Sequence, residues 1–123
     1  ALYMVTTIKE LIEKKEAIEA KKKEKIVLKT SIGDVVAVKP SASLITESLE
    51  LDDGNDEYFL LNSIVEPNLK DPELQAAYGC VVPTDIISKL FQYGEVKAMS
   101  SAIMDKVGAG KKIETAVYEE IKN

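Results

Sequence analysis

The chain has 123 residues, of which 46% are hydrophobic and 30% charged, a composition that is typical of a globular domain with a buried core and excludes a disordered chain. Its net charge is -5, lysine is its only basic residue type, and it has no histidine. This balance argues against nucleic acid and anionic membranes as partners, because both attract positively charged surfaces. No apolar run is long enough to cross a bilayer.

The cysteine content and the N-terminal residues indicate the cellular compartment in which the protein is expected to reside. Cys80 is the single cysteine, so no internal disulfide can form, and a reducing environment is expected. No basic region followed by an apolar core marks a signal peptide. We therefore expect a cytoplasmic protein that forms one domain over residues 1–123. The three residues before Met4 are compatible with a cloning remnant and are assigned no role.

The first predicted element is a helix over about residues 8–22. Thr7-Ile8-Lys9-Glu10 is a capping box, in which Thr7 and Glu10 satisfy each other's backbone donors. The apolar positions that follow define a narrow face, formed by Ile8, Leu11, Ile12, Ala17 and Ile18. The lysine run at residues 21–23 is interpreted as cations at the helix C-terminus, in preference to a nucleic-acid or lipid patch.

A β-hairpin is predicted over about residues 25–39. Two β-branched segments, residues 25–30 and 34–39, flank Ser31-Ile32-Gly33, where glycine suits a position that needs positive φ. Pro40 closes the second strand. Two strands alone are marginally stable in water, so the hairpin must lie against helices or pair with another chain.

The middle of the chain predicts a buried helix after an acidic turn. Residues 41–51 are compatible with a short helix or with an extended segment. The acidic residues 52–57 do not form an EF-hand, because Gly54 as the sixth position would place Leu49 first. They are interpreted as a turn that caps a helix over about residues 56–65. That helix is apolar nearly all round, as expected at the centre of a core.

Residues 66–95 hold three of the four prolines and predict a series of short helices. Asp71-Pro72-Glu73 is a helix start, and Gly79 ends that helix. Pro83-Thr84-Asp85 starts another helix, which Gly94 ends or kinks. Its apolar stripe is formed by Ile86, Ile87, Leu90 and Phe91. Tyr78 and Tyr93, each just before a glycine, are expected to anchor the corners between helices.

Two amphipathic helices are predicted to close the chain. The first has its apolar face at Val96, Met99, Ile103 and Val107. The second follows the hinge Gly108-Ala109-Gly110 and has its apolar face at Ile113, Ala116, Val117 and Ile121. The predicted fold class is therefore α+β, predominantly α, with short helices packed against one hairpin.

No constellation of residues indicates catalysis. Gly110-Lys111-Lys112 is not a phosphate-binding loop, because Asp105 stands where that loop needs its first glycine and Lys112 where it needs serine or threonine. Without histidine, a serine or cysteine nucleophile lacks its commonest base, and one cysteine cannot build a zinc site. Cys80 is interpreted as a packing residue. We expect a protein that is not an enzyme and has no metal or cofactor.

The run IVEPNLKDPELQAAYG, followed by an apolar helix and then by YGEV at the start of another, resembles the tail assembly chaperones of long-tailed bacteriophages and related prophages. These are short proteins encoded ahead of the tape measure protein in Gram-positive hosts. Family members usually have a proline before the Gly-Glu pair, where this chain has Tyr93. The chain also continues well past that helix, and both departures concern its C-terminal part.

The resemblance implies a chaperone that binds the tape measure protein in the host bacterial cytoplasm before the tail tube polymerises. The major tail protein is a further candidate client. It also implies a homo-oligomer that is absent from the mature virion. The candidate partner-binding residues are Glu66, Pro67, Asn68, Leu69, Asp71, Glu73, Leu74, Tyr78, Gly94 and Glu95.

Other interpretations remain open at this point. The chain could be a structural tail component that stays in the virion, or a small protein-interaction adaptor. A small enzyme using carboxylates and lysines is a third class, although no pair of residues supports it. The 66–79 motif itself could serve folding instead of client binding.

Overall fold

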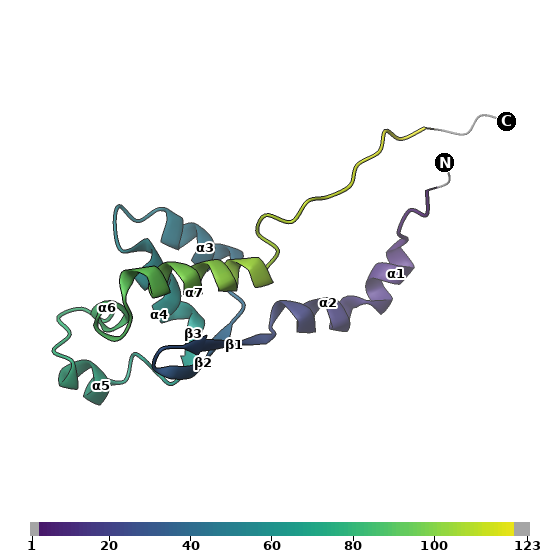
Figure 1. Cartoon of the computed structure of the whole chain (residues 1–123). Helices are drawn as coiled ribbons and strands as arrows, with labels where there is room; N and C mark the ends of the chain where they lie inside the picture. Colours follow the sequence, from purple (N-terminus) through teal and green to yellow (C-terminus); the bar gives the residue numbers. More distant parts are fainter. Residues whose placement is uncertain (1–2, 120–123) are drawn as a thin grey trace.

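The computed structural model describes residues 3–119. Figure 1 shows a core in which helices cover a small sheet, with both ends of the chain leading away from the core on the same side. The described part contains seven helices and one antiparallel sheet with strand order β1-β2-β3. The predicted α+β class with predominant helix is confirmed. Among the helices described, none is both long and apolar enough to cross a bilayer.

The sheet contains the predicted hairpin and one strand that the sequence did not reveal. Strands β1 (Lys25–Thr30) and β2 (Gly33–Val38) pair in register from Lys25↔Val38 to Thr30↔Gly33, so the turn is Ser31-Ile32. Gly33 has a φ of 117°, the positive value expected there. Strand β3 (Ile64–Glu66) pairs antiparallel with β2 through an irregular register. The predicted helix over residues 56–65 was therefore too long.

The core lies between one face of the sheet and three helices. Helix α4 (Asn55–Ser63) is central, and it contacts α3 (Ala42–Leu49), α6 (Asp85–Leu90) and α7 (Tyr93–Lys106). The helical alternative for residues 41–51 is confirmed. The buried apolar side chains are Ile26, Leu28, Val35, Ala37, Phe59, Leu60, Leu61, Ile64, Leu69, Ile86, Ile87, Phe91, Val96, Met99 and Ile103. Their burial supplies the main stabilising free energy of the fold.

The short helices begin where they were predicted to begin, but α6 ends earlier than expected. Helix α5 (Pro72–Ala77) starts after Asp71, and Gly79 follows it with a φ of 64°. Helix α6 ends at Leu90, and Phe91 is extended. Gly94 therefore does not end α6, because it lies in the first turn of α7. Tyr93 is exposed and does not anchor a corner.

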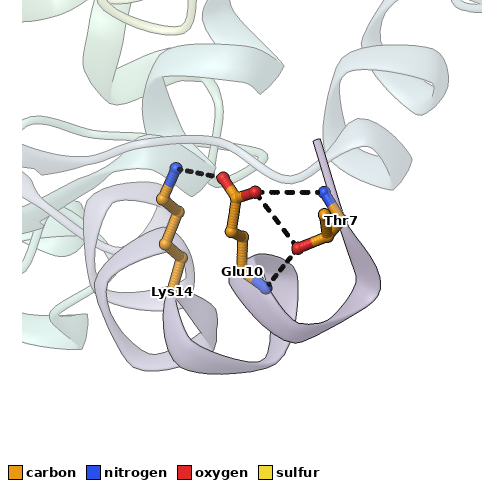
Figure 2. A network of polar contacts seen from close by, with 3 residues as sticks. All are labelled: Thr7, Glu10 and Lys14. Carbon is orange, nitrogen blue, oxygen red and sulfur yellow. Dashed lines mark hydrogen bonds and ion pairs between the residues drawn. The ribbon is translucent and has the colours of Figure 1, made fainter. Parts of the chain in front are cut away.

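The predicted N-terminal helix is two helices, α1 (Ile8–Glu13) and α2 (Lys15–Lys22), with a break at Lys14. We call residues 8–22 the N-terminal arm. The predicted capping box is confirmed: the Glu10 amide donates to the Thr7 hydroxyl at 3.2 Å, and the Thr7 amide donates to the Glu10 carboxylate at 3.3 Å. Figure 2 shows this network, with Lys14 pairing to the other Glu10 oxygen at 4.0 Å. No residue of either helix is buried.

The second C-terminal helix is not formed over the described residues. Residues 111–119 have no regular structure, and Ile113 and Val117 are exposed. A short amphipathic segment has little helix stability unless its apolar face is covered, and within residues 3–119 the Ile113 and Val117 side chains remain mostly exposed. Ile121, part of the predicted face, lies outside the described residues. Tyr3 touches this segment, donating its hydroxyl to the Val117 carbonyl at 2.8 Å. Ala1 and Leu2 also lie outside the described residues.

Candidate functional site

The segment that carries most of the predicted partner-binding residues is built around α5. We call residues 66–85 the α5 segment. It leaves the sheet through a cis Glu66-Pro67 peptide bond and enters a turn at Asn68, whose carbonyl accepts from the Asp71 amide at 3.1 Å. Asp71 then caps α5, accepting from the Leu74 amide at 3.0 Å. The helix start predicted from Asp71-Pro72 is confirmed.

Two polar side chains hold the loops on either side of α5. Gln75 donates from its amide nitrogen to the Leu69 carbonyl at 2.8 Å and to the Pro83 carbonyl at 3.0 Å. Asp85 accepts from the amides of Val81 at 2.9 Å and Val82 at 3.1 Å. The backbone hydrogen bonds from Val82 and then Val81 lower the pKa of the Asp85 carboxyl below its ordinary value. The hydrogen bonds of the Gln75 and Asp85 side chains therefore fix the backbone of the loop between α5 and α6.

The loop that these hydrogen bonds fix carries exposed apolar side chains, next to the predicted partner-binding residues of the α5 segment. Val81 is 91% exposed, and Val82 and Tyr78 are about half exposed or slightly less. Hydrogen bonds fix the loop backbone, while residues 3–119 leave these three side chains partly or almost wholly uncovered. An ordered backbone with exposed apolar side chains can bind a partner with a small loss of conformational entropy. Val81 and Val82 were not among the predicted residues.

The predicted residues divide into exposed and structural ones. Those on the surface of the α5 segment are Glu66, Pro67, Asn68, Asp71, Glu73 and Tyr78. Leu69 is buried in the core, and the half-buried Leu74 packs against it. These two leucines anchor the segment to the core. Asp71, although exposed, is engaged as the α5 cap.

Gly94 and Glu95 belong to a different part of the surface, at the start of α7. Glu95 accepts from the Ser31 amide at 2.8 Å and from the Ser31 hydroxyl at 2.5 Å. It thereby joins the hairpin turn to α7. Among the interactions described for residues 3–119, none links Gly94 or Glu95 to the α5 segment. The structure gives Glu95 a folding role.

Other groups with chemical interest have structural explanations. Cys80 is half-buried and packs against the core. Lys97 pairs with Asp56 across α7 and α4, and this hydrogen bond raises the pKa of Lys97. The Tyr58 hydroxyl donates to Glu47 at 3.0 Å, which raises the pKa of that tyrosine. Across residues 3–119, no group of three or more His, Cys, Asp or Glu side chains is placed to hold a metal ion.

Comparison with known proteins places the chain in a family. No curated protein and no solved structure matches it significantly. A family model described as phage XkdN-like tail assembly chaperone protein matches residues 8–122, which is nearly the whole chain. The resemblance inferred from the α5 segment and its flanks is thereby confirmed. The chain belongs to the phage XkdN-like family of tail assembly chaperones.

Proposed function

We propose that this protein binds the tape measure protein in the host bacterial cytoplasm before the tail tube polymerises, and keeps it soluble without performing chemistry. Membership of the tail assembly chaperone family supplies the general role, which is exercised in the host cell during assembly. The more specific client is our inference. The observation that supports it is the α5 segment, where Tyr78, Val81 and Val82 are exposed on an ordered backbone.

Binding would occur by transient burial of apolar side chains. A fully exposed valine that becomes buried contributes roughly 1.5–3 kcal/mol. Val81 is almost fully exposed, whereas Val82 and Tyr78 are about half exposed and contribute less, so the three side chains together support a modest affinity after the entropic costs of association. An amphipathic helix is the form in which a long helical client would present matching apolar residues. Modest affinity suits a chaperone because a later assembly step must displace it. We propose the major tail protein as a further client.

The acidic chain also suits a soluble complex. Its net charge of -5 opposes precipitation of a complex in which several copies bind one client. We propose that the chaperone self-associates on its client and leaves before the particle is complete. A structural tail component would make a different prediction, because it would remain in the virion.

The test is capture of the tape measure protein of the same phage or prophage, co-expressed with the tagged chaperone. Replacing both exposed valines of the α5 segment, Val81→Asp with Val82→Asp, should abolish capture while the far-UV circular dichroism spectrum stays unchanged. Val5→Asp is the matched control, because Val5 is also exposed and lies outside the α5 segment. Full capture by the double variant would contradict the proposed site.

A further inference from the structure

The α5 segment carries more negative than positive charge. Residues 66–85 contain one lysine, Lys70, and four acidic residues, so the formal net charge of the segment is -3. The acidic residues are Glu66, Asp71, Glu73 and Asp85. The same segment holds the exposed apolar side chains of the proposed client site, which are Tyr78, Val81 and Val82. A partner that docks on this surface must match both properties.

The fold places the acidic entrance to α5 beside the apolar loop that follows the helix. The Gln75 amide nitrogen donates to the Leu69 carbonyl at 2.8 Å and to the Pro83 carbonyl at 3.0 Å, so these two carbonyls lie close together. Leu69 comes three residues after Glu66, and Pro83 directly follows Val82. Negative charge and exposed apolar surface are therefore close to each other in space.

Three charged groups of the segment are engaged by the chain itself. Asp71 caps α5, and Asp85 accepts from two amides of the loop and lies close enough to Lys89 for their charges to interact. The Lys70 ammonium group donates to the Asn62 side chain on α4 at 2.8 Å. These three groups serve the local fold, so they are not the ones that we assign to a partner.

Glu66 and Glu73 are the remaining carboxylates of the segment. Both residues are exposed, and the ion pairs described for residues 3–119 include neither of them. Glu66 is the last residue of β3, and Glu73 lies in the first turn of α5. Exposed carboxylates beside an apolar patch attract a partner with basic side chains and disfavour one with acidic side chains.

We infer that the client docks a basic amphipathic helix on the α5 segment, with its apolar face against Tyr78, Val81 and Val82. Lysine or arginine side chains at the border of that face pair with Glu66 and Glu73. This inference rests on the proposed function and names the chemistry of the client segment that the site accepts. A helix can supply both properties, because residues at i, i+3, i+4 and i+7 share one face and their neighbours flank it.

The charge of the whole chain separates this occupant from a second copy. A second copy has a net charge of -5, so approach of its surface to an acidic segment is opposed by repulsion. A basic client segment is instead attracted. The affinity for it should fall as salt is added, because exposed charge pairs are screened, whereas burial of the valines is not.

The first test uses synthetic peptides of about 30 residues, long enough for several helical turns, that together cover the tape measure protein of the same phage or prophage. Each is titrated into the full purified chaperone by calorimetry at low and at high salt. We expect the peptides that bind to carry net positive charge and an apolar stripe at helical spacing, and their affinity to fall as salt is added. Binding peptides that are neutral or acidic, or affinities that salt leaves unchanged, would overturn the inference and leave the proposed client in place.

The second test compares two double variants of equal net charge. Glu66→Gln with Glu73→Gln removes two charges from the α5 segment, and Glu50→Gln with Asp53→Asn removes two exposed charges between α3 and α4. Both variants have a net charge of -3, so the effect of overall charge is the same in each. The control also lies in a more acidic region, because residues 47–57 contain six acidic residues and no lysine.

At low salt, the α5 variant should bind the tightest peptide and the full-length tape measure protein roughly twofold to thirtyfold more weakly, because two exposed ion pairs are lost. The control variant should bind as the wild-type chain does. All four positions are exposed, so circular dichroism should show that both variants remain folded. Equal weakening by the two variants, or weakening by the control alone, would overturn the inference.

Two further outcomes concern the occupant. If the wild-type chain binds neither the peptides nor the full-length tape measure protein, the proposed client is wrong and the inference fails with it. Light scattering of the chain alone tests for a second copy on the same surface. A mass above 13.5 kDa that the α5 variant loses and the control variant keeps would identify a second copy as the occupant, and would overturn the inference.

Discussion

Glu95 and Ser31 are 64 positions apart in the chain, and the Glu95 carboxylate accepts from both the amide and the hydroxyl of Ser31. The pair joins the turn of the hairpin to the first turn of α7. One acceptor thus connects the sheet with the helix that covers it. A carboxylate in the first turn of a helix also interacts favourably with the helix dipole.

Replacing Glu95 with alanine should lower the free energy of unfolding by about 1–2 kcal/mol, because two hydrogen bonds to a charged acceptor are lost. The measurement is urea denaturation followed by circular dichroism. Glu73→Ala is the matched control, since Glu73 is exposed on α5 and its loss should change the unfolding free energy by less than about 0.5 kcal/mol. Equal effects of the two substitutions would show that the link between Glu95 and Ser31 adds nothing.

Asp85 should titrate below its ordinary pKa of 3.8, because the amides of Val82 and Val81 stabilise its ionised form. A lowered pKa in the folded state means that the stabilisation is present above the unfolded-state pKa and is lost as pH falls through the folded-state value. Amide chemical shifts of Val81 and Val82 should therefore change with a midpoint under pH 3.8. Asp85→Asn should remove this titration, and a midpoint at or above 3.8 would refute the assignment.

Leu60 is fully buried at the centre of α4, and Leu60→Ala should lower the free energy of unfolding by about 2–5 kcal/mol. The loss combines the removed apolar burial with the cavity that is left. Leu49→Ala makes the same chemical change at an exposed position on α3 and should cost less than about 0.5 kcal/mol. Urea denaturation of both variants gives the comparison, and similar costs would mean that α4 is not central to the core.

Purified virions should lack this chain. A chaperone that leaves before completion should be present in lysates of infected or induced cells and absent from sedimented particles, when both are analysed by mass spectrometry. The tape measure protein in the same particles is the positive control. Stoichiometric recovery of the chain from particles would favour the structural tail component over the proposed chaperone role.

Features that depend on a few neighbouring residues could be predicted from the sequence. The capping box at Thr7 and Glu10 and the helix start at Asp71-Pro72 are local hydrogen-bond chemistry, and both are confirmed. The hairpin was predictable because Gly33 marks its turn between two β-branched segments. The membership of the chaperone family was also recognisable from the motif around α5.

Features that depend on distant packing could not be predicted. Strand β3 continues the apolar pattern of α4, and only its pairing with β2 identifies it as a strand. The apolar residues of the arm and of residues 111–119 have helical spacing, yet no part of the described chain covers them. The roles of Gln75 and Asp85 in the α5 segment depend on contacts with backbone groups several residues away. No pattern in the sequence predicted that the Val81 and Val82 side chains would be exposed.

Hydrogen exchange of the co-purified complex with the tape measure protein tests the client site most directly. Compared with the chaperone alone, backbone amides of residues 66–85 should exchange more slowly in the complex, and the Val81 and Val82 double variant should yield no complex. A complex that leaves these amides unchanged, with protection confined to other parts of the chain, would contradict the account.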